Sequence, residues 1–112
     1  MDAPQSTVPE IDVTELARLQ AAGVTLIDVR EPDEYDGGHV PGAELIPLGT
    51  VPERLDEAQA KEGTVYVICA MGGRSHKAAE FFRTNGIDAV NVAGGTKAWI
   101  EADRPTNTGM EP

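Results

Sequence analysis

The chain has 112 residues, and 19 acidic against nine basic side chains give it a formal net charge of −10 at pH 7. This length fits one domain with a modest core. The acidic balance argues against anionic membrane surfaces and against nucleic acid, whose binding rests on neutralising phosphates with Lys and Arg. No apolar run approaches the roughly 20 residues of a membrane helix, so we expect neither a nucleic-acid nor a membrane partner.

The single cysteine excludes an internal disulfide and suits a reducing compartment. The first residues carry neither the basic nor the apolar stretch that is typical of a signal peptide. We therefore expect a cytoplasmic protein.

The first ten residues are polar and hold two prolines, which predicts a loose N-terminal tail over residues 1–10. The folded domain is expected over residues 11–105, with residues 106–112 as a C-terminal tail. Asp12, followed by an acid three residues later, is typical of a helix start, and Gly23 is typical of the residue after a helix.

Residues 24–29, Val-Thr-Leu-Ile-Asp-Val, predict a short buried strand, and Asp28 and Arg30 lie where it ends. Asp28 has two interpretations. It could act as a general base, or it could accept backbone or arginine hydrogen bonds that fix the loop. His39 precedes a Val-Pro-Gly turn and is interpreted as a side chain that fixes this loop.

The remaining elements alternate between strand and helix patterns. They are predicted strands at 43–46, 64–68 and 89–92, and predicted helices at 50–58, 75–84 and 96–102. Trp99, in the last helix, is expected to anchor the core. The alternation predicts an α/β fold with a mainly parallel sheet and helices on both faces.

Cys69 ends the central predicted strand, and a loop with Gly72, Gly73, Arg74 and Ser75 leads from it into a helix. A strand, tight loop and helix direct successive backbone N–H groups and a helix N-terminus into one concavity. We expect the helix end and Arg74 to lower the pKa of the thiol. The alternative is a buried structural cysteine, which the adjacent glycines disfavour because they permit close approach of a ligand.

The Cys69 loop therefore predicts a nucleophilic thiolate that meets a small anionic substrate. Cysteine, histidine and carboxylate side chains show no metal-ligand spacing, so neither a metal nor another cofactor is expected.

Four motifs occur in one order along the chain: Asp-Val-Arg-Glu at 28–31, Gly-His-Val-Pro-Gly-Ala at 38–43, Cys-Ala-Met-Gly-Gly-Arg-Ser at 69–75, and Gly94-Gly95 followed by Trp99. With these motifs the chain resembles a single-domain rhodanese, a member of the rhodanese-like sulfurtransferase family. The resemblance spans nearly the whole chain and implies a small, mainly parallel five-stranded sheet.

The resemblance implies that Cys69 is the catalytic nucleophile of a ping-pong sulfurtransferase. Its thiolate would take a sulfane sulfur from thiosulfate, polysulfide or a protein persulfide, and pass it to cyanide or a thiol. Such a transfer needs no strong base, so Asp28 is expected to support the structure, together with Arg30 and His39. The residues expected to bind substrate are Ala70, Met71, Gly72, Gly73, Arg74 and Ser75.

Two other functions are considered. The first is a persulfide carrier or interaction module with little turnover of its own, which makes a sulfur-relay protein a candidate partner. The second is a cysteine-based phosphatase or an arsenate reductase. The loop disfavours it, because phosphatases have five residues between cysteine and arginine and this chain has four. Ala70 and Met71 are uncharged, whereas rhodaneses that use thiosulfate often carry a basic residue there, so the sulfur donor stays open.

Overall fold

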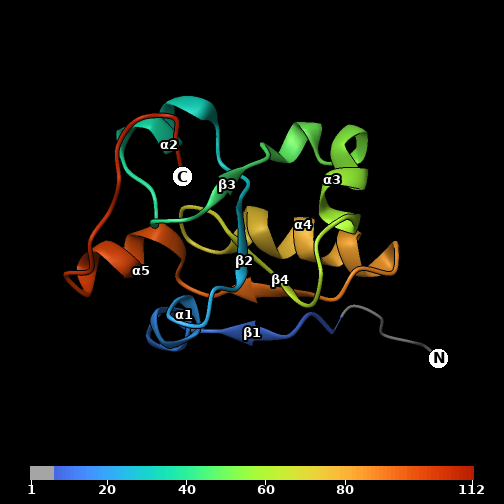
Figure 1. The fold of residues 1–112 in the computed structure, drawn as a ribbon, viewed down its shortest axis with the longest axis horizontal. Coiled ribbons are helices and arrows are strands. Elements are labelled where there is room, and N and C mark those ends of the chain that lie inside the picture. Colours follow the sequence, from blue (N-terminus) through green and yellow to red (C-terminus); the bar gives the residue numbers. More distant parts are fainter. Residues whose placement is uncertain (1–6) are drawn as a thin grey trace.

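The computed structural model describes residues 7–112, so residues 1–6 of the expected N-terminal tail lie outside the described residues. Five parallel strands form one sheet in the order β1-β5-β4-β2-β3. This confirms the predicted α/β class, and the sheet is wholly parallel (Figure 1). The strands are β1 (Glu10–Ile11), β2 (Thr25–Asp28), β3 (Glu44–Leu45), β4 (Val65–Ile68) and β5 (Ala89–Val92).

Helices cover both faces of the sheet, as predicted. The helices are α1 (Val13–Gln20), α2 (Pro32–Gly37), α3 (Leu55–Gln59), α4 (Gly73–Thr84) and α5 (Gly95–Glu101). Side chains of α3 and α4 pack with one face of the strands, and those of α1, α2 and α5 pack with the other. The core therefore consists of two apolar layers, one on each side of the sheet.

The alternation of side chains along each strand explains the two layers. In β4, Val67 faces the α4 layer and Ile68 faces the α5 layer. Successive strand residues point to opposite faces, so strands that are buried on both sides are mostly apolar. Trp99 is 2% exposed within the α5 layer, which confirms that it anchors the core.

The helix starts follow local capping chemistry. Asp12 accepts a hydrogen bond from the Glu15 backbone N–H at 2.9 Å and so caps α1. At α2, Glu31 precedes Pro32, and the backbone N–H of Glu31 donates to the Glu34 carboxylate at 2.9 Å. Helix α1 thereby begins where the sequence pattern predicts a helix start.

The predicted helix at 50–58 is wrong in its first half. The chain there forms two short 3₁₀ helices, Leu48–Thr50 and Pro52–Arg54, and becomes α-helical only at Leu55. The Thr50 hydroxyl donates to the Pro47 carbonyl at 2.8 Å, so it does not cap a following helix. The chain tightens into 3₁₀ turns of the kind that often connect elements.

Both expected tails contain ordered contacts. Glu10 belongs to β1, and the Pro9 carbonyl accepts from the Asn91 N–H at 2.9 Å. At the other end, Asn107 forms an antiparallel bridge with His39, and the C-terminus lies beside α2 (Figure 1). The segments 7–10 and 106–112 therefore pack on the domain.

Candidate functional site

The Cys69 loop joins the C-terminal end of β4 to the N-terminus of α4. Gly72 has φ +115°, a backbone conformation that glycine adopts readily and other residues rarely do. This turn directs the Gly72 N–H at the Cys69 Sγ, 3.1 Å away. The Ser75 hydroxyl, in the first turn of α4, lies 3.2 Å from the same sulfur. The loop therefore brings Cys69, Gly72 and Ser75 together, as the sequence predicts.

The thiol of Cys69 is buried, at 1% exposure. Burial raises its pKa, but hydrogen bonds from the Ser75 hydroxyl and from the backbone N–H groups of Ser75, Gly72 and Met71 outweigh burial and lower the pKa below its ordinary value. The stabilising groups are thus a hydroxyl and backbone amides, the kind of preorganised donors that stabilise a developing anion.

The N-terminus of α5 donates hydrogen bonds to the backbone of the Cys69 loop. The N–H groups of Thr96 and Lys97 donate to the carbonyls of Cys69 and Ala70 at 2.8 and 3.0 Å, and the Thr96 hydroxyl donates to the Cys69 carbonyl at 3.1 Å. This approach requires glycine at position 95, since a Cβ there would lie 2.5 Å from the Cys69 carbonyl oxygen. Glycine at this position thus permits the contact that holds the backbone next to the thiol.

Arg74 forms a bidentate ion pair with Glu34 of α2, at 2.8 and 3.0 Å. The Arg74 guanidinium, with the Glu31 backbone N–H, lowers the pKa of Glu34 from 4.5 to about 2. The sequence predicts that Arg74 lowers the pKa of the Cys69 thiol, but the guanidinium is paired with a carboxylate 40 residues earlier in the chain. Glu34 is a site residue that sequence reasoning missed, and no local pattern marks this pairing.

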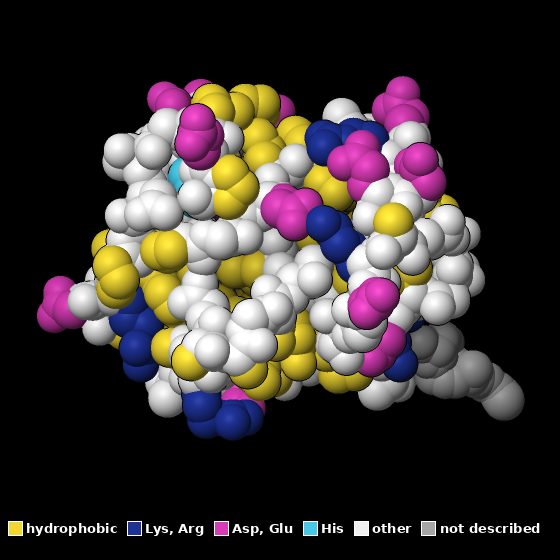
Figure 2. Space-filling view, in the orientation of Figure 1, with side chains coloured by type: hydrophobic (Ala, Val, Ile, Leu, Met, Phe, Trp, Pro, Cys, Tyr) yellow, Lys and Arg dark blue, Asp and Glu magenta, His cyan; other side chains and the backbone are white. Residues whose placement is uncertain are grey.

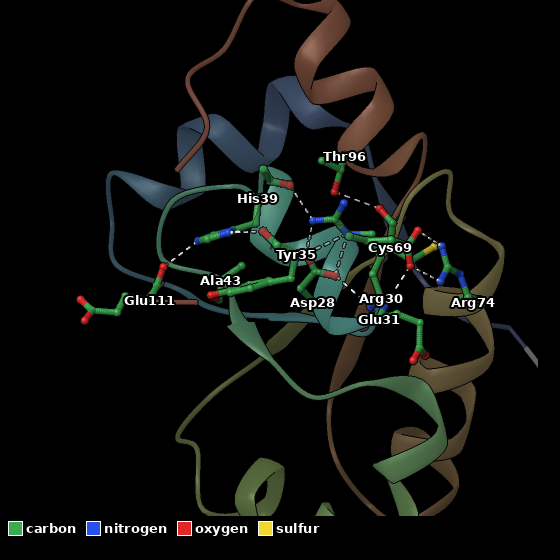
Figure 3. A network of polar contacts seen from close by, with 12 residues as sticks. Asp28, Arg30, Glu31, Tyr35, His39, Ala43, Cys69, Arg74, Thr96 and Glu111 are labelled. Carbon is green, nitrogen blue, oxygen red and sulfur yellow. Dashed lines mark hydrogen bonds and ion pairs between the residues drawn. The ribbon is translucent and has the colours of Figure 1, made fainter. Parts of the chain in front are cut away.

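Asp28 and Arg30 form a buried ion pair at the end of β2, with Arg30 Nη2 2.9 Å from Asp28 Oδ2. The Arg30 backbone N–H also donates to Asp28 Oδ1 at 3.0 Å, and Nη2 donates to the Gly38 carbonyl at 2.8 Å. Figure 3 draws this network together with Cys69. The carboxylate is occupied by these donors, which accords with the interpretation of Asp28 as a loop-fixing acceptor.

His39 is fully buried and stacks on Tyr35, with ring centroids 3.7 Å apart. Its Nδ1 lies 2.8 Å from the Tyr35 carbonyl, and its Nε2 lies 2.8 Å from the Glu111 carbonyl (Figure 3). Both ring nitrogens are therefore engaged by backbone oxygens. His39 ties the turn after α2 to the C-terminal segment, away from the thiol.

A second missed residue is Asn91 on β5, which is 1% exposed. Its side-chain oxygen lies 2.5 Å from the Ser75 hydroxyl oxygen, so it contacts the side chain that reaches the Cys69 sulfur. A polar residue in an otherwise apolar strand was the signal that could have revealed it, because buried amides need partners.

A shallow, mainly apolar depression lies beside the loop. It is lined by Ala70 and Met71 from the loop, by Ile100 of α5, and by Arg30, Thr96, Lys97 and Glu101. Met71 and Ile100 are 68% and 53% exposed. On the face drawn in Figure 2, acidic side chains are interspersed with basic and apolar ones. Within residues 7–112, no helix has the length and apolar character that crossing a membrane requires.

The rhodanese-like domain family model matches residues 12–102, so the chain belongs to the rhodanese-like family. A sulfurtransferase of Allochromatium vinosum is 34% identical over 101 residues, which cover 88% of this chain and 94% of that protein. Another relative, the uncharacterized protein YqhL of Bacillus subtilis, is 44% identical over 75 residues. The chain spans 59% of the length of YqhL and 52% of a further Bacillus subtilis relative.

Among solved structures, a rhodanese-related protein of Thermoplasma volcanium superposes with a TM-score of 0.83 at 33% identity. The match covers 92% of this chain and 99% of that one. The resemblance stated from the four motifs is therefore confirmed in both sequence and fold.

Proposed function

We propose that this protein is a sulfurtransferase that carries a sulfane sulfur as a persulfide on Cys69. The Cys69 thiolate attacks the outer sulfur of a donor, and the S–S bond of the donor breaks; with thiosulfate, sulfite leaves with the electron pair. A thiol or cyanide then attacks the outer sulfur of the persulfide. The Cys69 thiolate leaves, and the acceptor keeps the sulfur, so the reaction is a double displacement.

One observation carries this proposal: two hydrogen-bond donors from the loop converge on the Cys69 sulfur, the Gly72 N–H at 3.1 Å and the Ser75 hydroxyl at 3.2 Å. They favour the thiolate, which is the attacking form in sulfur exchange. The proposed cradle for the transferred sulfur is the loop itself, made of Ala70, Met71, Gly72, Gly73, Arg74 and Ser75. Its four residues between Cys69 and Arg74 leave less room than the five of a phosphatase.

The positively charged side chains near the loop are paired with carboxylates, and this pairing affects which sulfur donor can bind. Arg74 is held by Glu34, and Arg30 is held by Asp28. Lys97 of α5 pairs with Glu101. A small anion such as thiosulfate therefore finds little uncompensated positive charge, and the net charge of −10 repels it further. We infer that polysulfide or a protein persulfide loads Cys69 more readily than thiosulfate does.

The same pairing supports a second candidate, a persulfide carrier in a sulfur relay. The exposed apolar side chains of Met71 and Ile100 beside the loop suit contact with a protein that delivers or receives the sulfur. Such a carrier forms the persulfide readily but turns over slowly with small donors. A reducing compartment such as the cytoplasm fits both functions, because Cys69 must return to the thiolate.

Intact mass spectrometry tests the proposal. The protein is treated with thiosulfate or with polysulfide, and then with cyanide. We expect a gain of about 32 Da for one sulfur, larger in yield with polysulfide and lost to cyanide. The control is Cys69→Ser, which keeps the size of the side chain but forms no persulfide. An adduct that survives in Cys69→Ser, or no adduct with either donor, overturns the proposal.

Comparison of steady-state rates separates the two candidates. A sulfurtransferase produces thiocyanate from a small donor and cyanide through many turnovers, whereas a carrier stops after about one sulfur per protein molecule. Hydrolysis of p-nitrophenyl phosphate that depends on Cys69 would instead support the function of a cysteine-based phosphatase.

A further inference from the structure

The Ser75 hydroxyl lies between two acceptors. Its oxygen is 2.5 Å from the side-chain oxygen of Asn91 and 3.2 Å from the Cys69 sulfur. All three residues are buried, with exposures of 1% or less. A hydroxyl carries a single proton, so Ser75 can donate to Asn91 or to Cys69 but not to both at once.

The orientation of the Asn91 amide is fixed by its other contacts. Its Nδ2 donates to Glu10 Oε2 at 2.8 Å and to the Gly72 carbonyl at 3.2 Å. Both amide protons are thereby used, and the reversed amide would place an oxygen against a carboxylate and a carbonyl. Glu10 lies directly opposite Asn91 in the pairing of β1 with β5. The side-chain oxygen of Asn91 is therefore held toward Ser75.

The competition depends on the charge of the sulfur. A neutral thiol donates its own proton to the Ser75 oxygen, which leaves the Ser75 proton for Asn91. A thiolate needs that proton itself, because hydrogen bonds to a charged acceptor are stronger than those to a neutral one. When the hydroxyl turns to the sulfur, the Asn91 oxygen stays buried without a donor, which is unfavourable.

We propose that Asn91 is a positioning residue that competes with the Cys69 sulfur for the Ser75 proton and so favours the states in which this sulfur is uncharged. One such state is the thiol. The other, which rests on the proposed function, is the persulfide, where the negative charge lies on the outer sulfur. The proton stays on Ser75 throughout, and no bond at Ser75 forms or breaks. Ser75 turns between its two acceptors as the sulfur gains or loses charge.

The charged groups around the thiol do not change in this competition. Arg74 of α4 is paired with Glu34 of α2, and Asp28 is paired with Arg30 at the end of β2. Two further charged groups belong to neighbouring elements: Lys97 on α5, which is paired with Glu101, and Glu10 on β1, which accepts from Asn91. A substitution at Asn91 leaves all of these charged groups in place, so a change in the titration midpoint reports on the Ser75 proton.

The test is a pH titration of the thiolate absorbance in the reduced, sulfur-free protein. Asn91→Leu keeps the size of the side chain and removes the competing acceptor. We expect its titration midpoint to move to lower pH, and the thiolate fraction below the midpoint to rise about threefold to tenfold. Ser75→Ala removes the donor and should move the midpoint to higher pH. The double variant should titrate like Ser75→Ala alone, because Asn91 acts through Ser75.

The matched control is Thr96→Val, which removes a buried hydrogen bond to the Cys69 carbonyl and leaves the Ser75 proton untouched. Its effect on the midpoint should be small and should add to that of Ser75→Ala. Asn91→Ala replaces Asn91→Leu if leucine prevents folding. An unchanged or higher midpoint in both Asn91 variants, or full additivity in the double variant, overturns the proposal.

This titration requires no sulfur transfer, so it separates the role of Asn91 from the proposed function. If Cys69 never forms a persulfide, the proposed function fails while the titration result stands. Where the persulfide forms, Asn91→Leu should release its sulfur to cyanide faster than the wild-type protein does, since the departing thiolate is better stabilised. A lower midpoint without faster release overturns the part of the proposal that concerns the persulfide.

Discussion

Two neighbouring turns at the same edge of the sheet differ in what their polar groups bind. The turn after β2 carries the Asp28–Arg30 pair, and its donors and acceptors are satisfied within the chain. The turn after β4 directs its donors at a single sulfur atom, Cys69 Sγ. β2 and β4 are paired, with Asp28 opposite Ile68, so the two turns lie side by side. The first turn holds the local structure, and the second carries the proposed reactive site.

The comparison teaches that burial alone does not distinguish a structural polar group from a reactive one. Asp28 and Cys69 are both buried, at 0% and 1% exposure. Asp28 neutralises a cation that is held in place, whereas Cys69 can take up one more atom in its loop under the proposed function. Three substitutions test this contrast.

Breaking the Asp28–Arg30 pair should have the largest effect on the free energy of unfolding. Asp28→Ala leaves the Arg30 guanidinium buried without its counter-charge, and breaking a buried pair in this way costs about 3–5 kcal/mol. Urea unfolding measures the loss. The control is Lys61→Ala, which breaks a half-exposed pair with Glu44 and should cost about 1 kcal/mol or less. A loss below that of the control would show that Asp28 does not hold the turn.

Disturbing the contact behind the reactive loop should have the next largest effect. Gly95→Ala places a Cβ 2.5 Å from the Cys69 carbonyl oxygen. Gly86→Ala is the matched control, since Gly86 also has a positive φ but no atom near its Cβ position. We expect about 1 kcal/mol of destabilisation at Gly86 and about 1–3 kcal/mol more at Gly95 from overpacking.

The rate of Cys69 alkylation serves as the second measurement for these glycine variants. It should change in Gly95→Ala, because the clash shifts the Cys69 backbone, and stay at the wild-type value in Gly86→Ala. Equal alkylation rates in the two variants would contradict the assigned role of the contact.

Breaking the ion pair between Glu34 of α2 and Arg74 of α4 should have the smallest effect. The pKa of Glu34 is lowered to about 2 in the folded protein, first by Arg74. A lowered carboxyl pKa stabilises the fold above the ordinary pKa of 4.5, and this stabilisation is lost as the pH falls from about 4.5 to about 2. Glu34→Gln should lose about 1 kcal/mol near neutral pH, a value discounted because both side chains are about one third exposed.

Urea unfolding at a series of pH values measures this effect. The stability of Glu34→Gln should fall less than that of the wild-type protein between about pH 4.5 and 2. Glu57→Gln, in the more exposed pair with Arg54, is the control and should follow the wild-type curve more closely. Parallel curves for Glu34→Gln and the wild-type protein would exclude a stabilising role for the pair.

Much of this arrangement could be predicted because it depends on local chemistry. Asp12 before α1 marks a helix start. The apolar runs in the sequence predicted the strands β2, β4 and β5. The glycines after Cys69 predicted a tight loop. Each of these signals acts within a few residues, where capping and backbone conformation are decided.

The rest depends on residues that only the folded chain brings together. Glu34 and Arg74 are 40 residues apart, and Glu10 meets Asn91 from 81 residues away. The pairing of β1 with β5 places a polar pair beside the Cys69 loop. Neither segment by itself predicts this pair. Likewise, the 3₁₀ turns before α3 follow from the local path around Pro47 and Pro52, which the helical pattern over residues 50–58 does not reveal.

The two outer strands of the sheet also affect whether copies of this chain can associate through their sheet edges. Both edge strands, β1 and β3, have only two residues. Long, flat edges offer rows of open backbone groups on which another chain can add a strand, and short edges are one way in which proteins prevent this. The longer and more apolar strands β2, β4 and β5 lie inside the sheet, so the segments with the greatest tendency to aggregate are shielded on both sides.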